Sequence, residues 1–407
     1  MPPESWQKNL YTIFVAEFIV IIGFSFVNPF MPLFIQEMGA LTSQRAAFWA
    51  GIAASASGIA MFFSAPLWGI VADRWGRKPM VLRAMFGAGA VLALIGLAPN
   101  IYYIVILRFT QGLLSGTIAA ASALVAASTP RNKVPFAMGL LMVAVFGGTS
   151  FGPLAGGFMA DSVGYKAAFF ITGGLLFSGG LIVLFFVKEK FERPTKGQRA
   201  SLRSLLHLAK SREMLPLLLA LSALSAGPQM ITPIISLFIR ELNPEGMTAT
   251  ASGLAFGLMG VVAAISALVT SRLGGHISLK KMLIIACLGI GLLHLPPMWA
   301  RTATQLIIFI ALTGLFKGGL LTSSNALVGL SVPRDQQGIA YGLASSAKAL
   351  GNGLGPLIGG SLAPLMGLRP VFGVTGGFFM LTGIAISKLL ARVNLEKPSS
   401  QKVPAGL

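Results

Sequence analysis

The chain has 407 residues, of which 55% are hydrophobic and 11% are charged, and its mean hydropathy is +0.79. This composition excludes a soluble globular domain, whose apolar fraction is lower, and indicates a membrane protein. The formal net charge of +19 would fit a nucleic-acid partner, but the basic residues lie between apolar runs, in a pattern typical of membrane topology.

Apolar runs of about 20 residues, the length that a helix needs to cross a hydrocarbon core of roughly 30 Å, recur along the whole chain. We expect twelve membrane-spanning helices. The predicted spans lie near residues 10–35, 48–71, 79–98, 101–127, 136–160, 165–187, 214–238, 249–271, 281–299, 304–330, 339–363 and 369–392.

The first run is too long for the apolar core of a signal peptide, so we expect it to be the first span. It contains Glu17, the one acidic residue well inside a predicted span. Asn28 lies eleven residues further on, which returns it to the same face of a continuous helix. An ionised group in hydrocarbon costs several kcal/mol unless it faces a partner or a wet cavity, so Glu17 is a candidate functional residue.

The segment GIVADRWGRKPM, residues 69–80, follows the second span and concentrates charge in a chain that has little. Gly69 leaves room for a neighbouring helix, and Gly76 permits a tight turn before the third span. Asp73 is placed to pair with Arg77 or to accept from the N-terminus of a helix. The other basic residues of the segment fit the preference of cytoplasmic loops for such residues: Arg74 and Lys78.

Two further motifs lie in the fourth and fifth spans. In ILRFTQG, Arg108 and Gln111 share a helix face with Ser115. In GTSFGPLAGG, glycines recur every four or five residues and form a stripe without side chains, and Pro153 frees a backbone carbonyl. Such a stripe favours a close helix crossing. Its members are Gly148, Gly152, Gly156 and Gly157.

A polar segment separates two halves of the chain. We expect an N-terminal six-helix bundle over residues 1–187, a cytoplasmic central loop over 188–213, a C-terminal six-helix bundle over 214–393 and a short cytoplasmic tail over 394–407.

The two halves are related by an internal repeat. An offset of about 203 residues aligns Pro130-Arg131 with Pro333-Arg334 and the first glycine motif with a second one in the eleventh span. Two related bundles side by side leave a crevice near the bilayer midplane, the usual place for a transporter's substrate site. The expected fold is therefore an all-α membrane protein of twelve helices in two pseudo-symmetric bundles of six. The second glycine motif comprises Gly351, Gly355, Pro356, Gly359 and Gly360.

The second half also carries polar groups inside its predicted spans. These candidate cavity residues, with Asn28 and Gln111 of the first half, are Ser225, Gln229, Lys317, Lys348 and Asn352. For Ser225, the serine among them, a hydrogen bond between helices is the alternative role. Because Arg108, Lys317 and Lys348 outnumber the one acid, we expect a net positive cavity that favours neutral or anionic amphiphiles.

The basic residues lie mainly in alternate loops. If both termini are cytoplasmic, the outer loops hold only Arg45, Lys166, Arg240, Arg301 and Arg369. This is the positive-inside bias, so we expect cytoplasmic termini, inner-leaflet lipids as partners of the basic loops and no nucleic-acid partner.

Gly69, Asp73, Arg74, Gly76, Arg77 and Lys78 resemble the signature in the loop after span two of the major facilitator superfamily. Arg108, Gln111 and Gly112 resemble its element in span four, and residues 148–157 resemble its antiporter motif in span five. With the repeat, the resemblance covers essentially the whole chain and is to the twelve-span drug/proton antiporter branch. It implies that Asp73 and Arg77 hold the cytoplasmic side shut in the outward-facing state, and that Arg108 transfers protons or tunes the acid.

The sequence departs from the family pattern in two places. The second-half counterpart of the loop motif, residues 271–282, keeps basic residues but lacks the acid, so the first half would carry the latch alone. The glycine motif occurs in both halves, which weakens it as an indicator of transport direction.

We therefore expect a proton-coupled efflux antiporter that exports small amphiphilic compounds or drugs by alternating access, with Glu17 as the candidate proton-carrying carboxyl. A carboxylate that reaches back to the inner interface is the alternative for Glu17. An exporter or exchanger of one anionic metabolite is the alternative function, because Lys317 and Lys348 would suit it. The isolated histidines, and the absence of a Walker A loop or an acid pair in the spans, argue against an enzyme.

The proton gradient would supply the energy, so we expect no cofactor and no metal. The single cysteine, Cys287, excludes an intramolecular disulfide. The expected partners are a small-molecule substrate and the lipid bilayer, and the chain is expected to act as a monomer in the inner membrane of a bacterial cell.

Overall fold

The computed structural model describes residues 3–39, 41–189, 214–273, 277–330 and 337–389. Within these ranges the regular structure is helical. Most of the predicted central loop and the whole predicted tail lie outside the described residues.

The helices of the first half follow the predicted spans closely, except that two spans are interrupted. They are α1 (Pro3–Phe26), α2 (Met31–Gly39), α3 (Ser43–Trp75), α4 (Arg77–Ile95), α5 (Ile101–Leu114), α6 (Thr117–Ser128), the short η1 (Arg131–Lys133), α7 (Val134–Val163) and α8 (Tyr165–Phe186). The first span is divided into α1 and α2, and the fourth into α5 and α6.

The second half repeats this order. It contains α10 (Met214–Met230), α11 (Thr232–Leu242), α12 (Thr248–Leu273), α13 (Leu279–Leu293), the short η3 (Pro296–Trp299), α14 (Ala303–Leu330), α15 (Gln337–Met366) and α16 (Leu368–Leu389). The seventh span is divided into α10 and α11, as its repeat-related partner is divided into α1 and α2.

Eleven helical segments in the described ranges are long and apolar enough to cross a membrane. The eleventh predicted span, α15, is not among them, although its 30 residues make it long enough. Its glycines, serines and Lys348 lower its apolar content. Because α15 packs along α3 and α10, it completes the set of twelve expected spans.

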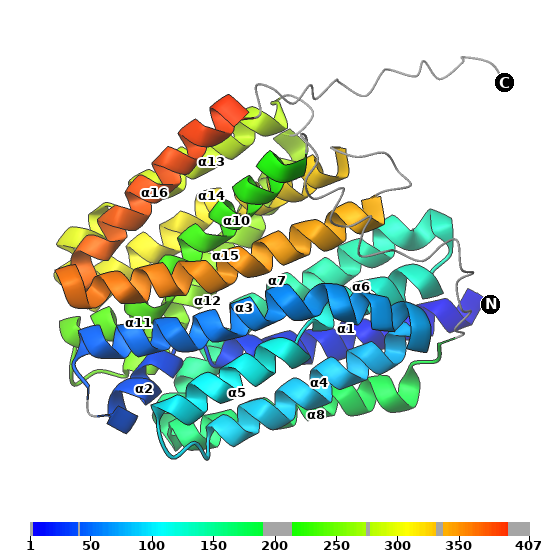
Figure 1. Ribbon diagram of the computed structural model, residues 1–407, viewed down its shortest axis with the longest axis horizontal. Coiled ribbons are helices and arrows are strands. Elements are labelled where there is room, and N and C mark those ends of the chain that lie inside the picture. Colours follow the sequence, from blue (N-terminus) through cyan, green and yellow to red (C-terminus); the bar gives the residue numbers. More distant parts are fainter. Residues whose placement is uncertain (1–2, 40, 190–213, 274–276, 331–336, 390–407) are drawn as a thin grey trace.

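The helices form two bundles that meet along two long crossings. In the first half α1 packs on α7 and α8, and α4 packs on α5 and α8. In the second half α10 packs on α15, and α13 packs on α14 and α16. The crossings between the halves are α3 with α15, which run side by side in Figure 1, and α7 with α12.

Glycines set the close approach of helices both within each bundle and between the two bundles. A Cβ atom at Gly156 of α7 would overlap the backbone of Phe26 in α1, and one at Gly359 of α15 would overlap the backbone of Met230 in α10. The last glycine of each motif faces the other bundle instead: Gly157 meets α12 and Gly360 meets α3. The two motifs therefore hold equivalent positions in the two halves, as the repeat predicted.

The two bundles approach each other unevenly along their length. We call the end at which α1 begins the terminal end, and the other the closed end; the terminal end is on the right in Figure 1. Towards the closed end, a Cβ at Gly51, Gly58 or Gly253 would overlap the facing bundle. Towards the terminal end, a Cβ at Gly69 or Gly342 would have nothing within 4 Å.

Candidate functional site

A cavity of about 300 Å³ lies between the two bundles. Helices α1 and α7 of the first half and α10 to α14 of the second supply its lining. Much of the wall is apolar, including Phe146, Phe256, Met259 and Leu321. The polar groups of the lining are Ser25, Asn28, Thr149, Gln229, Thr232, His294, Thr313 and Lys317.

Three of the predicted cavity residues line this space: Asn28, Gln229 and Lys317. The Oγ1 hydroxyl of Thr232 donates to Oε1 of Gln229 at 3.2 Å, which fixes the amide at the junction of α10 and α11. The Nζ atom of Lys317 lies 3.7 Å from the thioether sulfur of Met259, a weak acceptor. The described lining includes this one cation and no acid, so the prediction of a positive cavity now depends on Lys317.

The other predicted cavity residues are placed elsewhere by the structure. Ser225 packs beside Gly351 where α10 crosses α15, so it lies at a helix–helix contact. Gln111 is buried within the first bundle. Lys348 and Asn352 on α15 are not among the residues that line the cavity. A helical face assigned from sequence spacing alone did not identify which groups point inward.

His294 is a cavity residue that the sequence analysis dismissed as isolated. It is the first residue after α13, its side chain is 2% exposed, and it lines the cavity with Lys317. Its Nδ1 atom lies 2.7 Å from the carbonyl oxygen of Ile290, whereas its buried Nε2 atom has no hydrogen-bond partner. A histidine in an otherwise apolar stretch was the available signal.

Glu17 is fully buried but does not line the cavity. Its carboxyl lies beside Thr117, the first residue of α6, and among the described residues neither carboxylate oxygen has a partner that meets hydrogen-bond geometry. The first amides of a helix have no partner within the helix and carry partial positive charge, so the start of α6 can favour an anion here. The predicted shared face with Asn28 is wrong, because α1 ends at Phe26.

The interruption between α5 and α6 is held by side chains of α3 and α4. Gly116 has a φ of 118°, and the carbonyls freed just before it accept hydrogen bonds from three side chains. Ser64 Oγ donates to Gly112 at 3.3 Å, Trp68 Nε1 to Leu113 at 2.7 Å, and Arg83 Nη2 to Ser115 at 3.1 Å.

Arg83 of α4 also stacks on one of these side chains. Its guanidinium carbon lies 3.7 Å above the ring of Trp68, in a cation–π arrangement. Arg108, the predicted partner of the acid, donates from Nη1 to Oε1 of Gln111 at 2.7 Å, and its buried Nε has no partner.

The charged loop between α3 and α4 is tied to the end of α8. Gly76 has a φ of 99°, as expected of a tight turn. The amides of Arg77 and Lys78 both donate to the Glu189 carboxylate, and the shortest bond of each is 2.8 Å long. Lys78 Nζ donates to the carbonyls of Leu184 and Val187 at 2.8 and 2.6 Å, so it has a structural role beyond topology.

One part of the predicted gate is not engaged here, and a second lies outside the described side chains. No atom of the described residues lies within 4 Å of a Cβ built at Gly69, so within this part of the chain the close helix approach expected there is not present. The side chain of Asp73 lies outside the part of the chain that the structure describes. The acid that caps the start of α4 is Glu189, which the sequence analysis did not select.

The closed end carries polar contacts between the bundles. The Asp161 carboxylate at the end of α7 accepts from the amide of Thr250 at 2.7 Å, from its hydroxyl at 2.7 Å and from the amide of Ala249 at 3.3 Å, all in the first turn of α12. Arg240 of α11 forms an ion pair with Glu37 of α2 at 3.5 Å.

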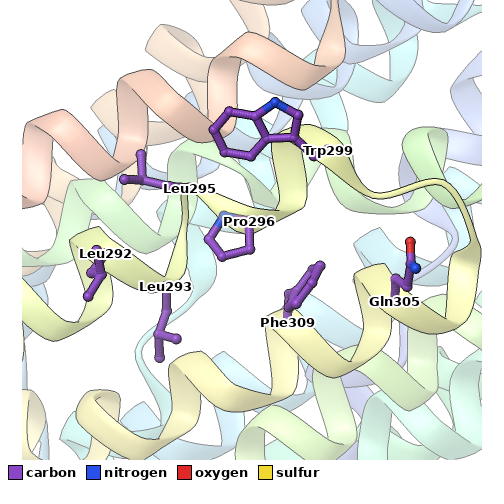
Figure 2. A pocket seen from close by; sticks show the side chains of 7 residues that line it. All are labelled: Leu292, Leu293, Leu295, Pro296, Trp299, Gln305 and Phe309. Carbon is purple, nitrogen blue, oxygen red and sulfur yellow. The ribbon is translucent and has the colours of Figure 1, made fainter.

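A second hollow, of about 650 Å³, lies where α13 continues through η3 into α14. Figure 2 shows its lining of Leu292, Leu293, Leu295, Pro296, Trp299, Gln305 and Phe309. Trp299 is 68% exposed and Leu292 61%, so this hollow opens to the outside of the bundle. Its lining carries no charged group, unlike that of the cavity between the bundles. Within the described ranges, no three His, Cys, Asp or Glu side chains gather in a way that could hold a metal.

Comparisons with known proteins agree with this architecture. The family model described as Major Facilitator Superfamily matches residues 13–293 and 217–406. Multidrug resistance protein MdtG of Escherichia coli O7:K1 is 34% identical over 401 residues, which cover 98% of each chain. MdtG of Escherichia coli O81 is likewise 34% identical, with the same coverage.

Solved structures share the fold at lower sequence identity. A bacterial homologue of the human lysosomal transporter Spinster, in an inward-facing and occupied conformation, has a TM-score of 0.78 and 13% identity, and the match covers 98% of this chain and all of that one. The human organic anion transporter MFSD10 has a TM-score of 0.68 and 19% identity over 95% of this chain and all of that one.

Proposed function

The chain belongs to the Major Facilitator Superfamily, and on that basis we propose that it is a proton-coupled efflux antiporter that exports small amphiphilic compounds. As a member of this family it is a membrane transporter and not an enzyme. The names of its relatives, multidrug resistance proteins, support export of more than one kind of compound. The observation that carries the proposal is a part-apolar cavity between two bundles that are joined at one end.

The uneven approach of the bundles supports alternating access. Asp161 and Arg240 join the bundles at the closed end, whereas the glycine positions near the terminal end face open space. The positive-inside bias would place the terminal end in the cytoplasm. In this proposal the conformation described here receives substrate from the cytoplasmic side, and the loop of Asp73 and Arg77 closes that side in the opposite state.

Glu17 is the proposed proton carrier. It is a fully buried carboxyl in a first-span helix, and its oxygens lack hydrogen-bond partners. Deprotonation leaves a negative charge beside the start of α6, and protonation removes that charge. Because α6 begins directly after the interruption at Gly116, a change of charge on Glu17 can bias the position of this half-helix relative to α1. Arg108 of span four, which is paired with Gln111, would assist this proton transfer.

The proposed substrate is a neutral or anionic amphiphile. Lys317 is the cation of the cavity lining, and apolar residues from both bundles surround it. An anionic group of the substrate would pair with Lys317, while aromatic and thioether side chains adapt to its apolar part. The protein would work as a monomer in the inner membrane of a bacterial cell, with the proton gradient as its energy source and without a cofactor.

A second candidate function is the export or exchange of one anionic metabolite. Lys317 and His294, two nitrogen groups in one small cavity, favour it, because paired polar contacts are typical of selective sites. The two functions differ in the range of compounds that compete for transport. A dedicated site is competed for by few compounds, whereas an efflux pump is competed for by many.

A susceptibility panel tests the proposal. The chain is expressed in a pump-deficient bacterial host and the minimal inhibitory concentrations of cationic, neutral and anionic amphiphiles are measured, with a Lys317→Met variant beside it. We expect protection against several unrelated neutral and anionic compounds, with protection against anions reduced in the variant. Protection against cationic dyes alone would contradict the assignment, and protection against one anion would favour the dedicated exporter.

A further inference from the structure

The hydrogen bonds of His294 define which of its nitrogens is available. The Nδ1 atom lies 2.7 Å from the carbonyl oxygen of Ile290. A carbonyl oxygen only accepts hydrogen bonds, so Nδ1 must carry the hydrogen and donate it. In the neutral ring the other nitrogen, Nε2, is then a hydrogen-bond acceptor.

The free acceptor is a buried atom of His294, one of the residues that line the cavity. The Nε2 atom has no partner among the described residues, and the side chain is 2% exposed. Packing holds the ring in place, because its centroid lies 5.7 Å from that of Phe379 on α16. A buried acceptor without a partner is unfavourable, so a ligand in the cavity that donates to it gains a hydrogen bond that the empty protein does not make.

Lys317 is the charged residue that lines the same cavity as His294. It comes from α14, which packs on α13, and it interacts electrostatically with His294. On the other helix packed against α13, α16, the described charged residues are Arg369 and Lys388, of which Arg369 donates to the carbonyl of Met298 outside this cavity. The ammonium group of Lys317 donates only, whereas Nε2 of His294 accepts.

We propose that His294 and Lys317 form a two-point recognition site for an amphiphile that carries an anionic group close to a hydrogen-bond donor. Lys317 pairs with the anion, Nε2 of His294 accepts from the donor, and the apolar wall around Met259 and Phe256 contacts the chain of the substrate. The inference rests on the proposed export function and makes it more specific. It assigns His294, which directly follows α13 and was not among the predicted cavity residues, as a specificity-determining residue.

Binding of three matched probes tests this assignment. The full-length protein in lipid nanodiscs is titrated calorimetrically with 3-hydroxyoctanoate, octanoate and octane-1,3-diol. We expect 3-hydroxyoctanoate to bind about tenfold more tightly than octanoate, the effect of one added net hydrogen bond. The diol, which lacks the anion, is expected to bind more weakly than 3-hydroxyoctanoate.

Variants separate the two contacts. His294→Leu is expected to bring the two acids to equal affinity without weakening octanoate, and His294→Gln to restore part of the difference, because its amide oxygen can accept near the position of Nε2. Lys317→Met is expected to weaken both acids and leave the diol unchanged. Lys166→Met, which removes an exposed lysine, serves as its matched control. Thermal melting of each variant checks that it is folded.

The outcomes distinguish this inference from the proposed function. Equal binding of the two acids by the unaltered protein would overturn it, as would an undiminished preference in His294→Leu. The latter result would mean that a group other than Nε2 of His294 accepts from the hydroxyl of the ligand. Either result leaves the efflux proposal standing if the susceptibility panel shows protection. A panel without any protection would remove the efflux proposal regardless of these affinities.

Discussion

The carboxylate of Asp161 in the first bundle accepts two hydrogen bonds of 2.7 Å from the amide and hydroxyl of Thr250 in the second. Asp161 ends a helix of one half, and Thr250 lies in the first turn of a helix of the other, so this acid caps a helix across the boundary between the bundles. The contact therefore exists only while the bundles are together at the closed end.

Removing Asp161 is expected to open the closed end. An Asp161→Ala variant loses three hydrogen bonds, and bonds to a charged acceptor contribute about 1.5–3 kcal/mol each before discounting for partial exposure. We expect a several-fold faster reaction of a cysteine at position 28, in a Cys287→Ala background, with a membrane-impermeant thiol reagent added from the outer side. Ser162→Ala is the control, because Ser162 bonds within its own helix. An unchanged labelling rate in Asp161→Ala would exclude a closing role.

The ion pair of Arg240 with Glu37 is expected to matter less. The two side chains are 36% and 50% exposed, and exposed pairs contribute about 0–1 kcal/mol. Glu37→Gln should therefore change the labelling rate at position 28 by less than Asp161→Ala does. The same assay at low and high salt checks this, since screening should reduce the small contribution of Glu37 further. A larger effect of Glu37→Gln would reverse the order assigned to these two contacts.

The glycine motif predicts a sharp contrast between two substitutions in α7. A Cβ at Gly156 would overlap the backbone of Phe26, whereas a Cβ at Gly139 would meet nothing within 4 Å. We expect Gly156→Ala to reduce stability by about 1–3 kcal/mol, seen as a lower melting temperature of the purified protein, because α1 must move away. Gly139→Ala should melt as the unaltered protein does. Equal melting temperatures for the two variants would argue against the close crossing of α1 and α7.

The interruption of the fourth span predicts a similar contrast between two tryptophans. Trp68 donates its Nε1 hydrogen to the carbonyl of Leu113 and lies under Arg83, whereas Trp75 is 73% exposed. Trp68→Phe keeps an aromatic ring but leaves that carbonyl without its partner, so we expect a loss of about 1–3 kcal/mol in stability and reduced transport. Trp75→Phe should affect neither. Wild-type stability in Trp68→Phe would show that water or another group replaces the bond.

The fold was largely predictable because the sequence patterns that indicate it extend over many residues. Apolar runs of about 20 residues define the spans, and the repeat relates the two glycine motifs, whose equivalent packing at Gly156 and Gly359 follows. The interruptions were not predicted. By hydropathy, residues 101–127 form one apolar run. The break before Gly116 depends instead on hydrogen-bond donors that are distant in sequence, namely Ser64, Trp68 and Arg83.

The site was predictable only in part, for a related reason. Polar residues in apolar spans are conspicuous, so Asn28, Gln229 and Lys317 were selected and line the cavity. The direction in which a side chain points depends on the rotation and ends of its helix, which spacing does not provide. Spacing therefore did not show that Lys348 would be absent from the lining of this cavity. His294 was missed because α13 ends just before it, and this ending brings the ring to the cavity lining.

Proton movement during transport tests the central claim most directly. The protein is reconstituted in liposomes that contain a pH-sensitive dye, and the compound against which it protects best is placed on one side. We expect the compound's gradient to drive protons in the opposite direction, and Glu17→Gln to abolish this proton movement while exchange of labelled for unlabelled compound continues. Glu245→Gln, which changes an exposed acid, should behave as the unaltered protein does. Undiminished proton movement in Glu17→Gln, or transport by the unaltered protein without any proton movement, would contradict the account.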